Sequence, residues 1–199
     1  MTTDPVITPP DDAAGPVRTI LDADEIQRAL TRMAHQVTEL SRGAESLLVL
    51  GIPTRGVPLS RRLAAEINRI EGIRVPVGDL DITLYRDDLR RNPTRTASRS
   101  RIPCPVEGRT VLLVDDVLYS GRTILAALDA LKDIGRPARV MLATLVDRGH
   151  RELPLQADVV GLRIGTGKDE RVAVHLAEHD GEDLVTIQRT TPDAAKGTR

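Results

Sequence analysis

Apolar residues recur at helical spacing near the start of the chain. A helix from about residue 24 to residue 40 would place on one face Ile26, Leu30, Met33, Val37 and Leu40. Asp24 is a candidate for its N-cap, because a carboxylate can accept hydrogen bonds from the N–H groups of the first turn. The run SLLVLGI (46–52) then predicts a short buried strand, and a second helix is expected over 57–70.

The rest of the chain continues the alternation of strands and helices. Strand-like residues return at 75–85, and a long polar stretch follows at 86–109. We then expect a strand at 110–117, a helix at 121–134, and strands at 138–146, 157–164, 170–176 and 184–188. This order predicts an α/β protein with a doubly wound, mainly parallel sheet. The last two strands have no helix between them, which indicates a small antiparallel flap, or hood. The polar stretch is too long for an ordinary connection, so it is either an active-site cover or a flexible loop.

The chain has 199 residues and a net charge of −1. Its length and composition are typical of one globular domain. We expect a disordered leader at 1–18, a single domain at 19–189 and a disordered tail at 190–199, because both ends are rich in proline, aspartate and small residues. No apolar run is long enough to span a membrane, and no secretion signal is recognisable. The lone Cys104 cannot form an internal disulfide, which favours a cytoplasmic protein. With a net charge near zero, any nucleic-acid site has to be a local patch.

The segment VLLVDDVLYSGRTI (111–124) carries the strongest chemical signal. Asp115 and Asp116 lie at the end of a buried strand, and in parallel sheets ligands bind at the carboxyl ends of the strands. Directly afterwards, the residues 120–123 offer hydroxyl groups and free N–H groups at a helix N-terminus, which suit a phosphate. Carboxylates for sugar hydroxyls beside a phosphate cradle indicate a ribose 5-phosphate pocket. The alternative is a strand end with solvated acids and a helix cap.

This segment resembles the phosphoribosyl pyrophosphate signature of the type I phosphoribosyltransferases. Within that superfamily the chain is similar to the PyrR family of bifunctional pyrimidine-operon regulators and uracil phosphoribosyltransferases. The similarity runs from about residue 22 to residue 187 and is carried by the blocks ALTRMAH (29–35), GIPTRG (51–56), DITLYRDDL (81–89), VDDVLYSGRT (114–123), DIGRP (133–137) and LVDRGHRELP (145–154). The resemblance implies the type I phosphoribosyltransferase fold, and a homodimer or higher oligomer.

The resemblance also implies roles for individual residues. Asp115 and Asp116 would meet the ribose hydroxyls and, directly or indirectly, Mg²⁺, and Arg55 would assist catalysis. Phosphoribosyl pyrophosphate and UMP would be bound by Thr54, Arg55, Gly56, Asp115, Asp116, Val117, Leu118, Tyr119, Ser120, Gly121, Arg122 and Thr123. The turn at 53–56 is also open to a plain structural reading, as a link from strand to helix.

The expected reaction is displacement of pyrophosphate from phosphoribosyl pyrophosphate by uracil, which gives UMP. Purine-using relatives have an acidic residue where this chain has Tyr119, and the missing carboxylate favours uracil as the base. Uracil is expected near Val159, Val160 and the turn at 147–149, with Arg148 as a contact. A purine phosphoribosyltransferase without a role in RNA binding is the alternative.

An RNA site is expected on the first helix. Arg28, Thr31, Arg32 and His35 form a polar stripe opposite its apolar face, which on its own is typical of a solvated helix surface. The resemblance implies instead that Thr31, Arg32 and His35, with Arg148 and Arg151, bind a messenger-RNA stem-loop of pyrimidine genes. The protein would then sense UMP in the pocket it uses for catalysis. The segment DRGHREL (147–153) is equally open to reading as a solvated charged loop.

Overall fold

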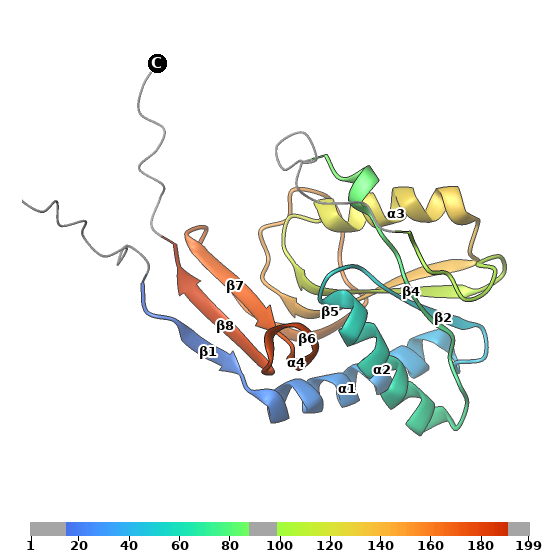
Figure 1. Cartoon of the computed structure of the whole chain (residues 1–199), viewed down its shortest axis with the longest axis horizontal. Coiled ribbons are helices and arrows are strands. Elements are labelled where there is room, and N and C mark those ends of the chain that lie inside the picture. Colours follow the sequence, from blue (N-terminus) through green and yellow to red (C-terminus); the bar gives the residue numbers. More distant parts are fainter. Residues whose placement is uncertain (1–14, 88–98, 191–199) are drawn as a thin grey trace, which may run out of the picture.

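The computed structural model describes residues 15–87 and 99–190. Its main sheet has five parallel strands in the order β3-β2-β4-β5-β6. These strands are β2 (Leu47–Gly51), β3 (Val77–Asp79), β4 (Thr110–Leu118), β5 (Arg139–Asp147) and β6 (Val159–Arg163). Helices α1 (Ala23–Ser41) and α2 (Gly56–Glu71) cover one face of this sheet, and α3 (Arg122–Ile134) covers the other (Figure 1). The predicted α/β fold with a mainly parallel sheet is therefore confirmed.

Strict alternation along the central strands explains the two layers. Along β4, Leu112 and Val114 belong to the core under α1 and α2, whereas Val111 and Leu113 belong to the core under α3. Successive side chains of a strand point to opposite faces, so an uninterrupted apolar run is buried on both sides. This explains why the sequences of these strands are continuous apolar segments.

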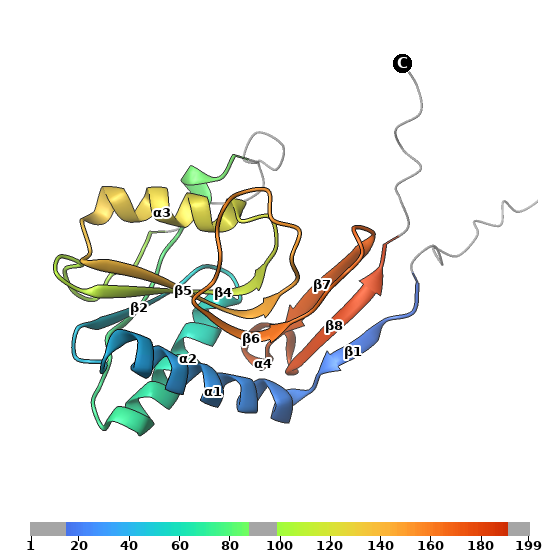
Figure 2. The same cartoon turned by 180° about the vertical axis from the view of Figure 1, so that it is seen from behind.

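The predicted hood is a separate antiparallel sheet that stands to one side of the main sheet (Figure 2). Strand β7 (Glu170–His175) pairs with β8 (Leu184–Arg189), as expected. The expectation that no helix lies between them is wrong: the short helix α4 (Ala177–Asp180) connects them, and its four residues are too few to show a helical period in the sequence. The sheet has a third strand, β1 (Arg18–Leu21), which pairs with β8 and was not predicted. Its four residues lack a distinctive pattern, and their pairing partner lies near the far end of the chain. β1 also begins inside the expected leader, most of which lies outside the described residues, as does nearly all of the expected tail.

Two local predictions are corrected. The N-cap of α1 is Asp22 rather than Asp24: Glu25 N donates to Asp22 Oδ1 (2.8 Å) and Asp22 N donates to Glu25 Oε2 (2.9 Å). This reciprocal pair is a capping box, and it requires a Glu three residues after the cap. The strand expected over 75–85 is limited to β3 and is followed by a 3-10 turn, η1 (Thr83–Tyr85), because Leu80 and Ile82 turn into the core under α3.

The long polar connection is only partly described. Residues 88–98 lie outside the described part, so its expected role as a cover stays a prediction. Arg101 forms a β-bridge with Asp79, and Cys104 packs, half-buried, against the core under α3. Within residues 15–87 and 99–190, none of the helices has the length and apolar character needed to cross a bilayer.

Candidate active site

Asp115 and Asp116 lie in the middle of the main sheet, but not where the strand ends. β4 continues to Leu118, and Val117 and Leu118 still pair with β5. The strand expected over 110–117 is confirmed and contains the acidic pair, which lies just before the C-terminal end of the strand at Leu118. Asp115 is 6% exposed and Asp116 is half-buried. The side chain of Asp115 accepts a hydrogen bond from the N–H of Asp116 (3.0 Å), and that of Asp116 accepts one from the N–H of Val117 (2.9 Å).

Burial makes ionisation of Asp115 costly. Loss of hydration raises the pKa of Asp115 well above its usual value, and the charge of neighbouring Asp116 raises it further. Arg86, at the start of the long connection, acts in the opposite direction by its positive charge. Two adjacent carboxylates in a buried strand lower the stability of the folded state, because they lose hydration and repel each other. Their presence therefore indicates that they bind a ligand.

The segment after the acidic pair forms a small cavity of about 240 Å³. Gly121 has a φ of 92°, a backbone conformation that favours glycine, and it places the start of α3 at the cavity. The N-cap residue Gly121 has no side chain to cap the helix, and Arg122 N makes only a long hydrogen bond to Ser120 Oγ (3.4 Å), so the first turn can bind an anion. The lining residues are Arg86, Asp87, Asp115, Val117, Leu118, Tyr119, Ser120, Gly121, Arg122 and Thr123. Of the predicted signature residues 115–123, all except Asp116 therefore line one cavity.

Arg122 bridges two acidic side chains at the edge of this cavity. Its Nη1 donates to Asp87 Oδ2 (2.5 Å) and its Nε to Glu152 Oε2 (2.7 Å). The guanidinium is about half exposed, so these ion pairs contribute little to stability. Arg86, Asp87 and Glu152 were not expected at the site, because the first two lie in the long polar connection and the third in a charged loop.

The turn 53–56 comes close to β4 from the side of β2. A side chain at Gly56 would meet the carbonyl oxygen of Val114 at 2.4 Å, so only glycine permits this approach. Ile52 N donates to the same oxygen (2.9 Å), and the Pro53–Thr54 peptide bond is cis. Thr54, Arg55 and Gly56 are thus held beside the acidic pair. The pKa of Arg55 is raised mainly by its hydrogen bonds to Asp180, and the negative charge of Asp116 adds to this effect.

Arg55 does not project freely into the site. Its Nε and Nη2 donate to the two carboxylate oxygens of Asp180 at 3.0 and 2.7 Å. Asp180 ends α4 in the hood, 125 residues further along the chain. No pattern in the sequence indicated that this aspartate belongs to the site; only the folding of the hood over the turn brings it there.

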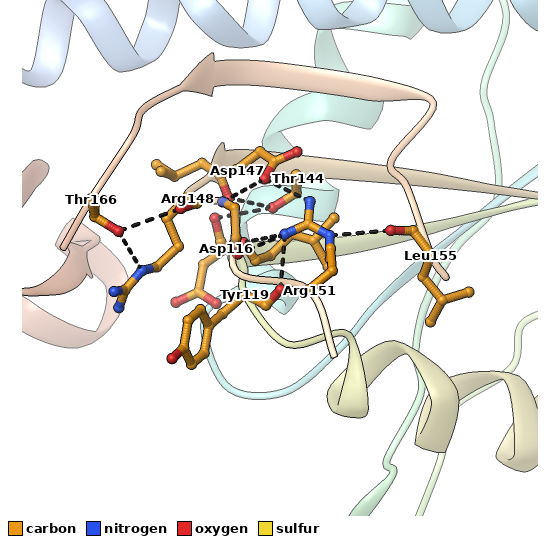
Figure 3. Close-up of polar contacts among 11 residues, drawn as sticks. Asp116, Tyr119, Thr144, Asp147, Arg148, Arg151, Leu155 and Thr166 are labelled. Atoms are coloured by element: carbon orange, nitrogen blue, oxygen red, sulfur yellow. Dashed lines mark hydrogen bonds and ion pairs between the residues drawn. The ribbon is translucent and has the colours of Figure 1, made fainter. Parts of the chain in front are cut away.

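The segment after β5 is bound to the end of β4 mainly through Arg151 (Figure 3). Arg151 Nη1 donates to the carbonyl oxygens of Leu118 (3.3 Å), Tyr119 (2.8 Å) and Gly149 (3.0 Å). Its Nη2 donates to Asp147 Oδ1 (2.6 Å) and its Nε to the carbonyl oxygen of Leu155 (3.1 Å). Arg151 therefore links the segment after β5 to the end of β4. To contact RNA, its guanidinium group would have to break these hydrogen bonds.

Arg148 is likewise engaged inside the protein. It is 7% exposed, its guanidinium carbon lies 4.4 Å from the centre of the Tyr119 ring, and it donates to Thr166 Oγ1 (3.1 Å) and to the carbonyl oxygen of Gly167 (3.1 Å). Arg148 therefore lies against Tyr119, a residue that lines the cavity, and its proposed contacts with uracil and RNA stay predictions.

The two valines expected near uracil do not lie beside the turn 147–149. Val159 is fully buried in the core under α1 and α2, and Val160 packs, half-buried, toward the core under α3. In the pairing of β5 with β6, Asp147 stands opposite Arg163, several residues beyond the valines. Their expected position is corrected accordingly, because the register of two parallel strands was not readable from sequence.

The polar side chains of α1 contact two different neighbouring elements, α2 and β6. Thr31 Oγ1 donates to Glu66 Oε2 of α2 (3.2 Å) and to the carbonyl oxygen of Gln27 (3.1 Å). Arg32 Nη2 donates across to the carbonyl oxygen of Gly161 in β6 (3.0 Å), and His35 is exposed. Arg32 thus lies beside β6 and Thr31 faces α2, while His35 is exposed on the same helix.

Comparison with known proteins gives concordant results. Residues 16–178 match the model of the phosphoribosyl transferase domain family. The chain is 56% identical to the bifunctional protein PyrR of Leifsonia xyli over 176 residues, which cover 86% of this chain and 96% of that protein. It is 57% identical to the bifunctional protein PyrR of Streptomyces coelicolor, with coverage of 85% and 89%.

Solved structures of purine-using enzymes share the fold. A hypoxanthine-guanine phosphoribosyltransferase from Bacillus anthracis superimposes with a TM-score of 0.64 at 21% identity, covering 85% of this chain and 96% of that one. The hypoxanthine phosphoribosyltransferase of Trypanosoma cruzi gives 0.66 at 16% identity, covering 87% and 97%. At such low identity these similarities concern the fold alone.

Asp115→Asn is expected to raise the free energy of unfolding at pH 7 by about 1 kcal/mol in metal-free buffer. Because the folded state raises the pKa of Asp115, wild-type stability falls as the pH rises through that pKa. The gain should therefore shrink toward zero as the pH approaches about 4, where Asp115 is protonated in the folded state and half-protonated in the unfolded state. Urea unfolding at both pH values measures this, with exposed Glu45→Gln as the control. A loss of stability at pH 7 would contradict it.

Arg151→Gln is expected to lower the free energy of unfolding by about 3 kcal/mol, because Asp147 and several carbonyl oxygens lose their donor. Arg171→Gln removes the same charge from an exposed position of β7 and should change stability by less than about 0.5 kcal/mol. Denaturant titrations of both variants give the comparison. Equally small effects would mean that Arg151 is free for another role.

Proposed function

The chain belongs to the phosphoribosyl transferase domain family and, within it, to the PyrR proteins, and from this we propose that it is both an enzyme and a regulator. As an enzyme it converts uracil and phosphoribosyl pyrophosphate to UMP and pyrophosphate. As a regulator it binds a messenger-RNA stem-loop of pyrimidine genes and senses UMP in the same pocket. The observation that carries the proposal is the cavity in which a buried carboxylate and the N-terminus of α3 face one ligand.

Ribose 5-phosphate fits the two ends of this cavity. The uncapped first turn of α3 offers N–H groups and a favourable dipole for the 5-phosphate, and the hydroxyl groups of Ser120 and Thr123 line the same space. Asp115 and Asp116 lie along β4 from this cradle, where they can accept hydrogen bonds from the ribose hydroxyls. A polyhydroxylated ligand therefore explains why the chain tolerates two adjacent acids in a buried strand.

The reaction breaks the bond between the anomeric carbon and pyrophosphate and forms one to a ring nitrogen of uracil, which gives up its proton. Positive charge develops on the sugar, and the carboxylates of the acidic pair stabilise it. Negative charge develops on the pyrophosphate, and the turn 53–56 offers Arg55 to it. The protein thereby places opposite charges on the two sides of the breaking bond.

Mg²⁺ fits the donor set of the site. Magnesium is commonly held by one or two carboxylates together with substrate phosphates. Asp115 and Asp116 provide such a pair, and the described residues contain no group of three potential ligands that would form a complete protein cage. The ion would thus be held jointly by the acidic pair and the substrate, and when bound it supplies positive charge to the departing pyrophosphate.

Tyr119 supports uracil as the base. Its ring is covered by the guanidinium of Arg148 on one face and has the ring of His150 at its edge, with centroids 6.0 Å apart. This cluster offers aromatic surface and cationic donors but no carboxylate that could assist a purine nitrogen. The identity of more than 50% to PyrR proteins also disfavours the purine alternative.

The exposed part of α1 supports the RNA role. Arg28, Arg32 and His35 are exposed on α1 and present cationic or hydrogen-bonding groups, and Arg32 lies beside β6, where Arg163 is also exposed. A two-fold symmetric homodimer would double this patch, which helps to reconcile RNA binding with a net charge of −1. Arg148 and Arg151 are already bound within the protein, so the proposal places the RNA contacts mainly on α1.

The wild-type protein is expected to form UMP from uracil and to use hypoxanthine and guanine much more slowly. Asp115→Asn combined with Asp116→Asn should lower the rate by at least about a hundredfold, because contacts that strengthen as the sugar becomes cationic are lost. Product formation measured by chromatography, with circular dichroism as a check on folding, decides this. Faster turnover of a purine base, or near-normal turnover by the folded double variant, would refute the assignment.

Thr31→Ala combined with His35→Ala is expected to weaken binding of the stem-loop RNA by about tenfold, while the rate of UMP formation stays within about twofold. Both side chains lie outside the cavity, and neither is part of the buried core. Gln36→Ala, on the same helix but outside the stripe, is the matched control. Gel-shift titration and the enzyme assay on one preparation separate the functions. Unchanged RNA binding would leave the stripe as a solvated surface.

A further inference from the structure

The hood is fastened to α2 by two arginines. Arg55, the N-cap of α2, binds Asp180, and Arg62, two turns further along, binds Glu178 and Asp183. All three acids lie in the short segment around α4 that joins β7 to β8. The two contacts lie at different distances along α2 from the acidic pair. Arg55 is in the turn beside the pair, whereas Arg62 is further along the helix.

The carboxylate of Asp180 is itself held rigidly. Its Oδ2 accepts a hydrogen bond from the N–H of Leu176 (2.9 Å), and its own N–H donates to the carbonyl oxygen of Leu176 (2.7 Å). The side chain is 18% exposed. The hydrogen bonds from Arg55, and then the one from Leu176, lower the pKa of Asp180 to about 2, so it remains ionised throughout the range in which an enzyme is assayed.

A bidentate contact of this kind fixes the plane of a guanidinium group. Asp180 occupies Nε and Nη2 of Arg55, and among the described residues no hydrogen bond from Nη1 is recorded. Arg55 also lies close enough to Asp116 for the two charges to interact. One edge of the guanidinium is thus held by the hood, and the group is kept beside the site where the proposed pyrophosphate departs.

We propose that Asp180 is a positioning residue that orients Arg55 toward the pyrophosphate group of the substrate. This rests on the proposed phosphoribosyltransferase function and deepens it, because it assigns the hood a part in pyrophosphate binding. Asp180 acts through Arg55 and does not touch the substrate. The acid therefore matters for pyrophosphate and not for the base.

The test compares Asp180→Asn with Asp183→Asn in the full-length protein. Asparagine can accept from Arg55 through only one oxygen, and its amide N–H groups oppose those of the guanidinium. Asp180→Asn should raise both the KM for phosphoribosyl pyrophosphate and the Kd for magnesium pyrophosphate by about tenfold, with the KM for uracil within about twofold. Asp183→Asn weakens the other contact between hood and helix and should change neither constant, although both variants lower the melting temperature.

A double-mutant cycle shows whether the effect passes through Arg55. Once Arg55→Gln has removed the guanidinium, adding Asp180→Asn should change the Kd for magnesium pyrophosphate by less than about twofold. A full tenfold further loss in that background would overturn the proposal, and so would an unchanged or tighter Kd in Asp180→Asn alone. Equal effects of Asp180→Asn and Asp183→Asn would also overturn it, because they would indicate general loosening of the hood.

Calorimetric titration with magnesium pyrophosphate needs no turnover, so it separates this proposal from the proposed function. If the wild-type protein binds pyrophosphate but does not convert uracil, the proposed reaction fails while the contact between Asp180 and Arg55 can still be judged. If the wild-type protein converts uracil and the variants behave alike, only the role of Asp180 fails.

Discussion

The carbonyl oxygens at the end of β4 need hydrogen-bond donors, and most of the site depends on how they are supplied. The chain leaves the sheet after Leu118, so the carbonyl oxygens of residues 118–120 have no further strand to pair with. Arg148 N and Arg151 bind the first of them, Arg151 the second, and the N–H groups of Glu152 and Leu153 the third. An unpaired buried carbonyl would cost about 1–3 kcal/mol. The segment after β5 therefore fixes the loop that opens α3, and with it the cavity for the phosphate.

The second general feature is that the arginines of the site are already paired before a ligand is present. Arg55 is held by Asp180, and Arg122 by Asp87 and Glu152. An incoming phosphate or pyrophosphate meets cations whose orientation is fixed and whose charge is partly balanced. Asp115 of the acidic pair, by contrast, carries a strong electrostatic penalty, because burial and the charge of Asp116 raise its pKa. The unfavourable charge is thus concentrated where a sugar and a divalent cation would relieve it.

The proposed regulatory surface and the pocket are joined by a short structural path. Arg32 of α1 donates to the backbone of β6, β6 pairs with β5, and the segment after β5 carries the donors that hold the phosphate loop. Arg32, which is proposed to contact RNA, is therefore linked through β6 and β5 to the segment that holds the phosphate loop. The hood closes the other side, where α4 reaches the turn 53–56.

The order of elements, both buried faces of the sheet and the segment 115–123 could be read from the sequence, because they depend on local periodicity and on residues adjacent in the chain. The family resemblance likewise rested on short blocks that keep their spacing. Tertiary structure alone determined the third hood strand β1, the place of Asp180 on Arg55, the internal hydrogen bonds of Arg151, and the burial of Val159. Each of these depends on which distant segment a residue meets, through strand register or the folding of the hood. The residues near each segment in the sequence do not indicate which distant segment it will contact. The two segments stabilise each other only once the chain has folded and brought them together.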